Sequence, residues 1–205
     1  MRNRKPNNWG GSMVEFTMLI PIWLPLLIGT QWLGSSMVRG QQTIQMARDL
    51  ASMYSRGVNF STVGSTASNA TLNQITQQLG ALTANGTGRV IFSTITWVGN
   101  ALCPAHNCTN YHHFVFTQQY TQGNTGLVTS NFGTPTGTTD ASLNLTDYVT
   151  NANDQSSFNL ITPVPAETGS DGYQAGQPIY VVEVYFQSTG LAGYTKGGDY
   201  AYAVF

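Results

Sequence analysis

The chain has 205 residues, of which 8% are charged and 41% hydrophobic, and its formal net charge is −1. A typical soluble domain carries about 25% charged residues, so this composition argues against a cytosolic enzyme with a densely charged surface. It also argues against a nucleic-acid binder, which needs clustered lysine and arginine for phosphate contacts. The hydrophobic content argues against intrinsic disorder.

The charges divide the chain into two parts. Six of the eight basic residues lie in the first 57 positions, whereas seven of the nine acidic residues come later. The N-terminal part is therefore basic and apolar, and the rest is mildly acidic and rich in Gly, Thr and Asn. Because the later acidic residues are spread singly, they indicate a solvated surface rather than an interaction tail.

An uninterrupted apolar segment covers residues 16–38 and contains no charged residue. A helix of this length spans about 34 Å, which is enough to cross a hydrocarbon core of about 30 Å. Three basic residues precede the segment within the first five positions, and only Arg39 follows it closely. The positive-inside rule therefore predicts a cytoplasmic N-terminus, with residues 40–205 outside.

A cleaved secretory signal peptide is the alternative for this segment, since it also combines a basic start with an apolar stretch. The apolar run is long for such a peptide, and a helical pattern continues beyond it. Residues 39–56 carry Ile44, Ala47, Ala51 and Tyr54 at helical spacing. This spacing predicts an amphipathic helix that extends the spanning segment.

Glu15 lies at the edge of the apolar segment, where a carboxylate is costly unless it is hydrated or paired. It can simply lie at the headgroup interface. It also belongs to a pattern, because Gly10 is followed by four residues and then by Glu15 and Phe16, between a basic leader and an apolar helix. The two interpretations differ in whether Glu15 has a partner.

This pattern resembles the class III (type IVc) prepilin cleavage site, and residues 9–56 are similar to the TadE/TadG-like pseudopilins of tight-adherence pilus systems. The acidic residue that the family often has between two glycines is missing, and a second proline, Pro25, is present. The resemblance covers about a quarter of the chain. It rests on Val14-Glu15-Phe16, Pro21, Gly29, Gly34 and Met46-Ala47-Arg48-Asp49.

The resemblance implies a membrane-inserted, non-enzymatic pilin-like subunit involved in pilus assembly and surface adhesion. It implies that a prepilin peptidase cuts between Gly10 and Gly11, which removes the leader of residues 1–10. In such families the carboxylate at the position of Glu15, beside Phe16, is thought to meet the free N-terminal amine of a neighbouring subunit. Two opposite charges in a low dielectric offset each other's desolvation penalty.

The resemblance also implies partners and a location. The expected partners are other pilin or pseudopilin subunits, the prepilin peptidase, an inner-membrane assembly platform and membrane lipid, with no nucleic acid. The chain is expected in the bacterial inner membrane as a single-pass protein, and at the cell surface or in a pilus after assembly. The alternatives are an uncleaved single-pass anchor that displays an extracytoplasmic ligand-binding domain, or a minor pseudopilin of a secretion system.

Beyond the membrane-spanning and amphipathic helix of residues 11–57, the sequence predicts an extracytoplasmic α+β domain over residues 58–205. A Ser/Thr/Gly-rich linker is expected at 61–68, a helix over 69–83, and a long excursion over 122–177. We expect an antiparallel sheet packed against the long helix, in a pilin-like fold. The strands are predicted over Arg89–Val98, Tyr111–Thr121, Ile179–Ser188 and Asp199–Phe205.

The two cysteines, Cys103 and Cys108, enclose four residues and favour a disulfide outside the cytoplasm, in the turn between the first two strands. The nearby histidines raise the possibility of zinc, but Cys-x4-Cys is not a usual zinc spacing. His112 and His113 are expected on opposite faces of a strand. We therefore expect no metal and no cofactor. His106 is the third histidine of the chain.

Catalysis has little support, since the chain contains no Gly-x-Ser-x-Gly or His-Glu-x-x-His motif and no phosphate-binding loop. Within the third predicted strand, Glu183 is expected to face solvent, and the loop acids Glu167 and Asp171 indicate no dyad. We expect no catalytic residue. A group of tyrosines could form a sugar- or surface-binding patch, although packing within the sheet is favoured. These are Tyr173, Tyr194, Tyr200 and Tyr202.

Overall fold

The structure is a computed structural model that describes residues 9–61, 66–76, 79–158, 176–189 and 196–205. The chain divides into two compact units, Met1–Arg39 and Gly40–Phe205. Helix α1 (Trp9–Ser55) begins in the first unit and ends in the second. The second unit also contains helix α2 (Thr66–Thr76) and a four-stranded antiparallel sheet, so the fold is α+β as predicted. The predicted domain ranges themselves stay predictions.

The sheet has the strand order β2-β1-β3-β4, and every neighbouring pair is antiparallel. Each strand matches one of the four predicted segments, although β2 begins later than predicted and β4 begins earlier. Both shifts concern strand ends, which are the least certain part of a sequence-based assignment. The strands are β1 (Gly88–Trp97), β2 (Phe114–Gly123), β3 (Ile179–Thr189) and β4 (Lys196–Val204).

A β-bulge interrupts the pairing of β1 with β2 between Thr94 and Ile95. Thr94 pairs with Gln118, whereas Ile95 pairs with Phe116, so β2 contains one extra residue at this point. Because side chains alternate between the two faces of a sheet, the bulge keeps Gln118 on the face of Thr94 and Phe116 on the face of Ile95. Each face thus keeps its own set of core residues.

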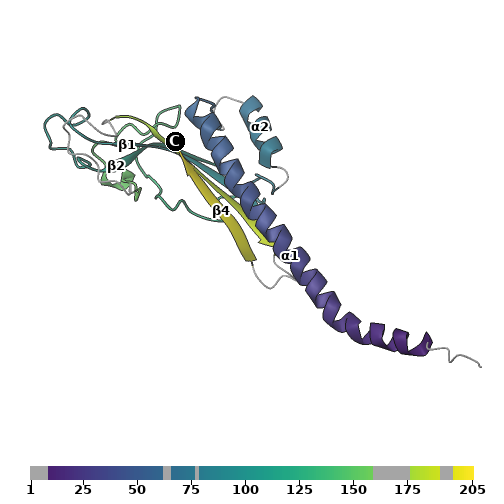
Figure 1. The fold of residues 1–205 in the computed structure, drawn as a ribbon. Helices are drawn as coiled ribbons and strands as arrows, with labels where there is room; N and C mark the ends of the chain where they lie inside the picture. The colour runs from purple at the N-terminus through teal and green to yellow at the C-terminus, as the bar shows by residue number, and fades with distance from the viewer. Residues whose placement is uncertain (1–8, 62–65, 77–78, 159–175, 190–195) are drawn as a thin grey trace, which may run out of the picture. The chain divides into compact units, whose positions relative to one another are not determined.

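The second half of α1 buries one face against the sheet (Figure 1). Met46, Ala47, Leu50 and Tyr54 are each at most 6% exposed. The helix predicted from the spacing of Ile44, Ala47, Ala51 and Tyr54 is present, but Ile44 is 47% exposed whereas the other three residues are buried. The buried positions step by three or four residues and include Thr43, so the apolar stripe begins one position away from Ile44.

The hydroxyl of Tyr54 anchors the end of α1 to the sheet. It donates a hydrogen bond to Gln118 Oε1 at 3.0 Å and shares a second one with Thr94 Oγ1 at 2.6 Å. Its ring lies edge-on to Phe92, with the ring centroids 5.4 Å apart, and Phe60 stacks on Phe92 at 4.9 Å. The helix end is therefore held by both apolar contacts and buried hydrogen bonds.

Helix α2 is shorter than the predicted helix over 69–83 and begins earlier. The main-chain N–H groups of Leu79 and Gly80 both donate to the carbonyl of Thr76 at 3.0 Å. Leu79 lies outside α2 and is buried in the core. Part of the predicted linker lies outside the described residues.

The opposite face of the sheet is covered by the long segment between β2 and β3. Its Leu145 and Phe158 pack with Phe116 and Val181 of the sheet. Within the described residues this segment contains one short 3-10 helix, η1 (Ala152–Asp154), and isolated bridges. The described part of this segment therefore supplies a second core without forming a second sheet.

The predicted disulfide between Cys103 and Cys108 is present, in the connection between β1 and β2. His112 and His113 do not belong to a strand, in contrast to the prediction, because β2 begins at Phe114. His112 has a φ of 64°, and its N–H donates to the carbonyl of Val98 at 2.8 Å. This bond holds a turn at the position where the sequence pattern indicated extended backbone.

Candidate functional site

The part of α1 from Met13 to Val38 is apolar on all sides and exposed. Phe16 is 68% exposed and Trp23 is 64% exposed. Among the described residues, this helix alone is long and apolar enough to cross a membrane, judged by its length and composition. A helix that is hydrophobic all round is stable in lipid or among other apolar helices rather than in water.

The hydroxyl groups of this segment are satisfied within the helix. Thr17 Oγ1 donates to the carbonyl of Met13 at 2.7 Å, and Ser35 Oγ donates to the carbonyl of Trp32 at 2.9 Å. Donors that bond to their own helix do not present an unsatisfied polar group to hydrocarbon. The hydroxyls are thus compatible with a spanning helix.

Two prolines and two glycines interrupt the large apolar side chains. Pro21 and Pro25 lie inside α1, where each removes a main-chain donor of the helix. At Gly29 and Gly34, an added Cβ would meet nothing within 4 Å. The small size of these glycines is therefore not required by contacts of this chain, and it leaves room for a neighbouring helix.

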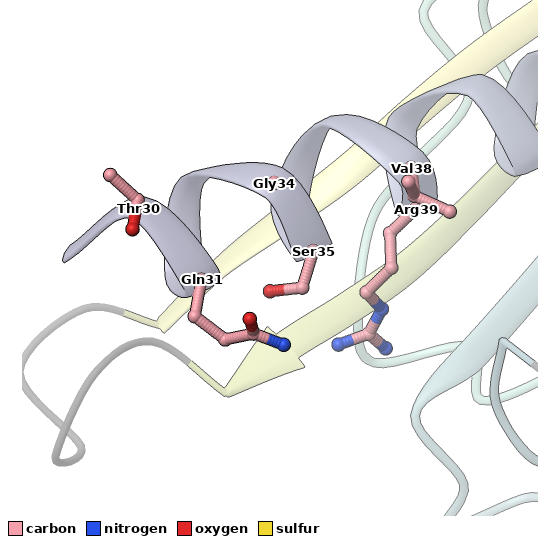
Figure 2. A pocket seen from close by; sticks show the side chains of 6 residues that line it. All are labelled: Thr30, Gln31, Gly34, Ser35, Val38 and Arg39. Carbon is pink, nitrogen blue, oxygen red and sulfur yellow. The ribbon is translucent and has the colours of Figure 1, made fainter. Parts of the chain in front are cut away.

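A shallow hollow lies beside Gly34 on α1, within the first unit. Figure 2 shows Gln31, Ser35 and Arg39 one turn apart along the same side of the helix. The hollow combines small residues with a side-chain amide and a guanidinium. Small residues allow close approach of helices, and amides can form hydrogen bonds between them. The complete lining is Thr30, Gln31, Gly34, Ser35, Val38 and Arg39.

The predicted processing and assembly residues lie at the start of α1. Gly10 and Gly11 fall in its first turn, and Glu15 and Phe16 follow one turn later with exposed side chains. Gly11 and Glu15 are four residues apart and therefore lie on the same face of the helix. The structure gives their positions, and their processing and assembly roles stay predictions.

Glu183 is 1% exposed, so the expectation that it faces solvent is wrong. Its carboxylate accepts hydrogen bonds from Tyr200 Oη at 2.6 Å and from the Asn131 N–H at 2.8 Å, and also from Ser130 Oγ. The segment after β2 covers this face of the sheet and supplies two of these donors. Glu183 is thus a fully bonded structural carboxylate.

Two of the four tyrosines of the possible patch lie in β4, with their ring centroids 6.3 Å apart. Tyr200 uses its hydroxyl to bond Glu183, whereas Tyr202 is 57% exposed and its ring lies 5.4 Å from that of Phe132. Both tyrosines therefore make contacts within the domain, Tyr200 through its hydroxyl and Tyr202 through its ring. Tyr173, Tyr194, Glu167 and Asp171 lie outside the described residues.

The histidines near the disulfide form ring contacts. The Tyr111 ring stacks on His112 with centroids 4.0 Å apart and lies 4.7 Å from His106. Over the described residues, no group of three or more His, Cys, Asp or Glu side chains could hold a metal ion. A smaller group, the carboxylates of Asp147 and Asp154, has no role predicted from the sequence, because six intervening positions in a loop-like segment indicate no proximity.

Comparisons of this chain with protein-family models, with curated proteins and with solved structures give no match.

Proposed function

We propose that this chain is a non-enzymatic, membrane-inserted pseudopilin-like subunit of a tight-adherence type. The observation that carries the proposal is the division of α1 into two halves. The half after Gly40 buries one face in the core of its own domain, whereas the half from Phe16 to Val38 exposes apolar side chains on all sides. Such a helix supports a role in which lipid first covers it and neighbouring subunits cover it later.

The start of α1 supports processing by a prepilin peptidase. Cleavage between Gly10 and Gly11 removes the basic leader and creates a new N-terminal amine one helical turn before Glu15. In an assembled filament, this amine of one subunit pairs with the Glu15 carboxylate of the next. The pair stabilises the apolar assembly because each charge compensates the other after both leave water.

The hollow beside Gly34 supports close helix packing in the assembly. Its small residues allow another helix to approach, and Gln31 supplies an amide that can bond across the contact. The assembled subunits display the domain of residues 40–205 on the outside, for adhesion. Other pilin-like subunits, the peptidase and an inner-membrane assembly platform are the partners in this proposal.

The processing step is tested by expressing the full chain in membranes with and without a prepilin peptidase. Intact mass and peptide sequencing are expected to show loss of residues 1–10 and a new N-terminus at Gly11. Gly10→Trp is expected to block cleavage, whereas the matched variant Asn8→Trp, which adds the same bulk further upstream, is still cleaved. A wild-type chain that keeps Met1 beside a peptidase active on another prepilin contradicts the proposal and leaves the uncleaved anchor.

The assembly step is tested with Glu15→Gln, which keeps the size of the side chain and removes its charge. In cells that contain the assembly platform, this variant is expected to be cleaved normally but absent from sheared filaments. Glu15→Asp keeps the charge and is expected to restore part of the assembly. Wild-type protein that is cleaved but never recovered in filaments favours the minor pseudopilin of a secretion system.

A further inference from the structure

The carboxylates of Asp147 and Asp154 meet beside Gly137, in the segment between β2 and β3. Asp154 is the last residue of η1, and Asn151 caps that helix by accepting a hydrogen bond from the Asn153 N–H. The carbonyl of Asp147 accepts the N–H groups of residues 150 and 151 in the preceding turn. A short, locally bonded stretch of chain thus carries both acids.

Main-chain donors hold both carboxylates in place. The Gly137 N–H donates to Asp154 Oδ1 at 2.8 Å, and the Thr138 N–H donates to Asp147 Oδ1 at the same distance. Asn151 Nδ2 donates to Asp147 Oδ2 at 3.0 Å. Two consecutive N–H groups therefore orient the two acids toward one place, and their oxygens keep lone pairs for a further ligand.

Asp154 is buried and incompletely bonded. Its side chain is 0% exposed, and its Oδ2 has no hydrogen-bond partner. Burial raises the pKa of this carboxyl and the charge of Asp147 raises it further, whereas the main-chain N–H groups of Gly137 and Thr136 lower it in part. A buried carboxylate oxygen without a donor costs free energy unless a proton or a cation compensates it.

Gly137 packs directly against both carboxylates, which occupy the space that a side chain at this position would need. A Cβ at this position would lie 2.5 Å from Asp147 Oδ1 and closer still to Asp154 Oδ2. Gly137 does not adopt a positive φ, so the site needs glycine for space rather than for backbone conformation. Because Asp147 Oδ1 and Asp154 Oδ2 both lie against Gly137, they are close enough to share a single cation with oxygen ligands at about 2.3–2.6 Å.

We propose that Asp147 and Asp154 bind a calcium ion beside Gly137. Calcium prefers carboxylate and carbonyl oxygens, accepts six to eight ligands in irregular geometry, and completes its shell with main-chain carbonyls and water. Magnesium demands a near-octahedral arrangement at shorter distances, and zinc prefers nitrogen and sulfur ligands. The site goes beyond the proposed function, since it is independent of the membrane helix and of assembly.

The test compares the full chain in detergent with EGTA, with CaCl₂ and with MgCl₂, by thermal unfolding and by isothermal titration. Calcium is expected to raise the Tm by several degrees, since a ligand that binds only the folded state stabilises it. It is expected to bind at one site, and magnesium is expected to have a much smaller effect. Asp154→Asn and Asp147→Asn are each expected to abolish both the shift and the binding.

Asp140→Asn is the matched control, because it removes one charge from the same segment. The Asp140 carboxylate is exposed and accepts the N–H groups of Ser142 and Asn144 in its own turn. This variant is expected to keep the calcium shift. In EGTA, Asp154→Asn is expected to be at least as stable as the wild type, because it removes a buried charge, and this shows that a lost shift is not a folding defect.

Two outcomes overturn the proposal. One is a wild-type Tm that does not respond to calcium at about 10 mM, a concentration above the dissociation constants of about 10⁻⁴–10⁻³ M found in extracellular calcium modules. The other is a shift of equal size in the wild type, Asp140→Asn and Asp154→Asn, which indicates unspecific screening. Either result indicates that a bound proton, rather than a cation, neutralises the buried carboxylate of Asp154.

Discussion

Tyr200 Oη donates a hydrogen bond of 2.6 Å to Glu183 Oε1 across the β3–β4 pair. Glu183 pairs with Tyr202 in the strand register and Tyr185 pairs with Tyr200, so the bond runs diagonally between neighbouring positions. The same carboxylate accepts the N–H of Asn131. One buried acid thus fastens both the edge strand β4 and the covering segment to the sheet.

Tyr200→Phe is expected to lower the free energy of unfolding by about 1.5–3 kcal/mol, which is typical of hydrogen bonds to charged groups. The reason is that Glu183 stays buried and loses its donor on β4. Denaturant unfolding of the full chain in detergent measures the change. Tyr202→Phe removes an exposed hydroxyl from the same strand and is expected to have little effect. Equal losses in the two variants argue against the importance of the buried bond.

The same tyrosine predicts a dependence on alkaline pH. Burial raises the pKa of Tyr200 from its ordinary value of 10.0, and the Glu183 carboxylate raises it further. Above pH 10 the unfolded chain loses this proton while the folded chain keeps it, so the free energy of unfolding falls as pH rises. Tyr200→Phe is expected to make this fall shallower. An unchanged slope between about pH 9 and pH 11 contradicts this role of Tyr200.

Tyr54→Phe is expected to destabilise the domain by about 1–3 kcal/mol, because Thr94 and Gln118 lose a buried partner. Both losses occur where α1 meets the sheet. A double-mutant cycle with Thr94→Val isolates their shared hydrogen bond. The two substitutions are expected to be non-additive, and additivity within about 0.3–0.5 kcal/mol indicates that the pair is not coupled.

Leu50→Ala and Ile44→Ala test which face of α1 is buried. Leu50 is 0% exposed and Ile44 is 47% exposed. Truncation of the buried leucine is expected to cost about 2–5 kcal/mol, since it loses apolar contacts and leaves a cavity. The exposed isoleucine is expected to change stability by less than about 0.5 kcal/mol. A larger loss of unfolding free energy in Ile44→Ala than in Leu50→Ala, measured by denaturant unfolding, contradicts the burial of the Leu50 face.

Replacing Cys103 and Cys108 by Ala is expected to lower the free energy of unfolding by about 2 kcal/mol, because the closed loop is short. The loss concerns the connection between β1 and β2. Dithiothreitol is expected to lower the Tm of the wild type to that of the double variant. It is expected to leave the double variant unchanged, and a response there shows that the reductant acts elsewhere.

The strands and the disulfide were predicted correctly because short-range features of the sequence determine them. β-branched and aromatic runs predicted the four strands, and the spacing of Cys103 and Cys108 predicted the disulfide. The helix itself was predicted, and three of its four named positions, Ala47, Ala51 and Tyr54, are buried, whereas Ile44 fits the helical period but lies outside the covered stripe. Only tertiary packing decides between two such stripes.

The candidate sites also depend on contacts between distant segments, which the sequence does not reveal. Strand alternation placed Glu183 toward solvent, but it does not reveal that residues 130 and 131 fold over that face and supply donors. The meeting of Asp147 and Asp154 depends on two consecutive N–H groups from the far side of a loop. By contrast, the apolar character of α1 from Phe16 to Val38 follows from composition alone.

The burial of the second half of α1 determines where the chain can be cut for recombinant expression. A soluble fragment that begins at residue 58, where the sequence analysis placed the domain, lacks Met46, Leu50 and Tyr54 and leaves their apolar partners on the sheet in water. Such a fragment is expected to aggregate. A fragment that begins at Gly40 keeps this part of the helix and omits the exposed apolar segment, so it is the piece suited to crystallisation.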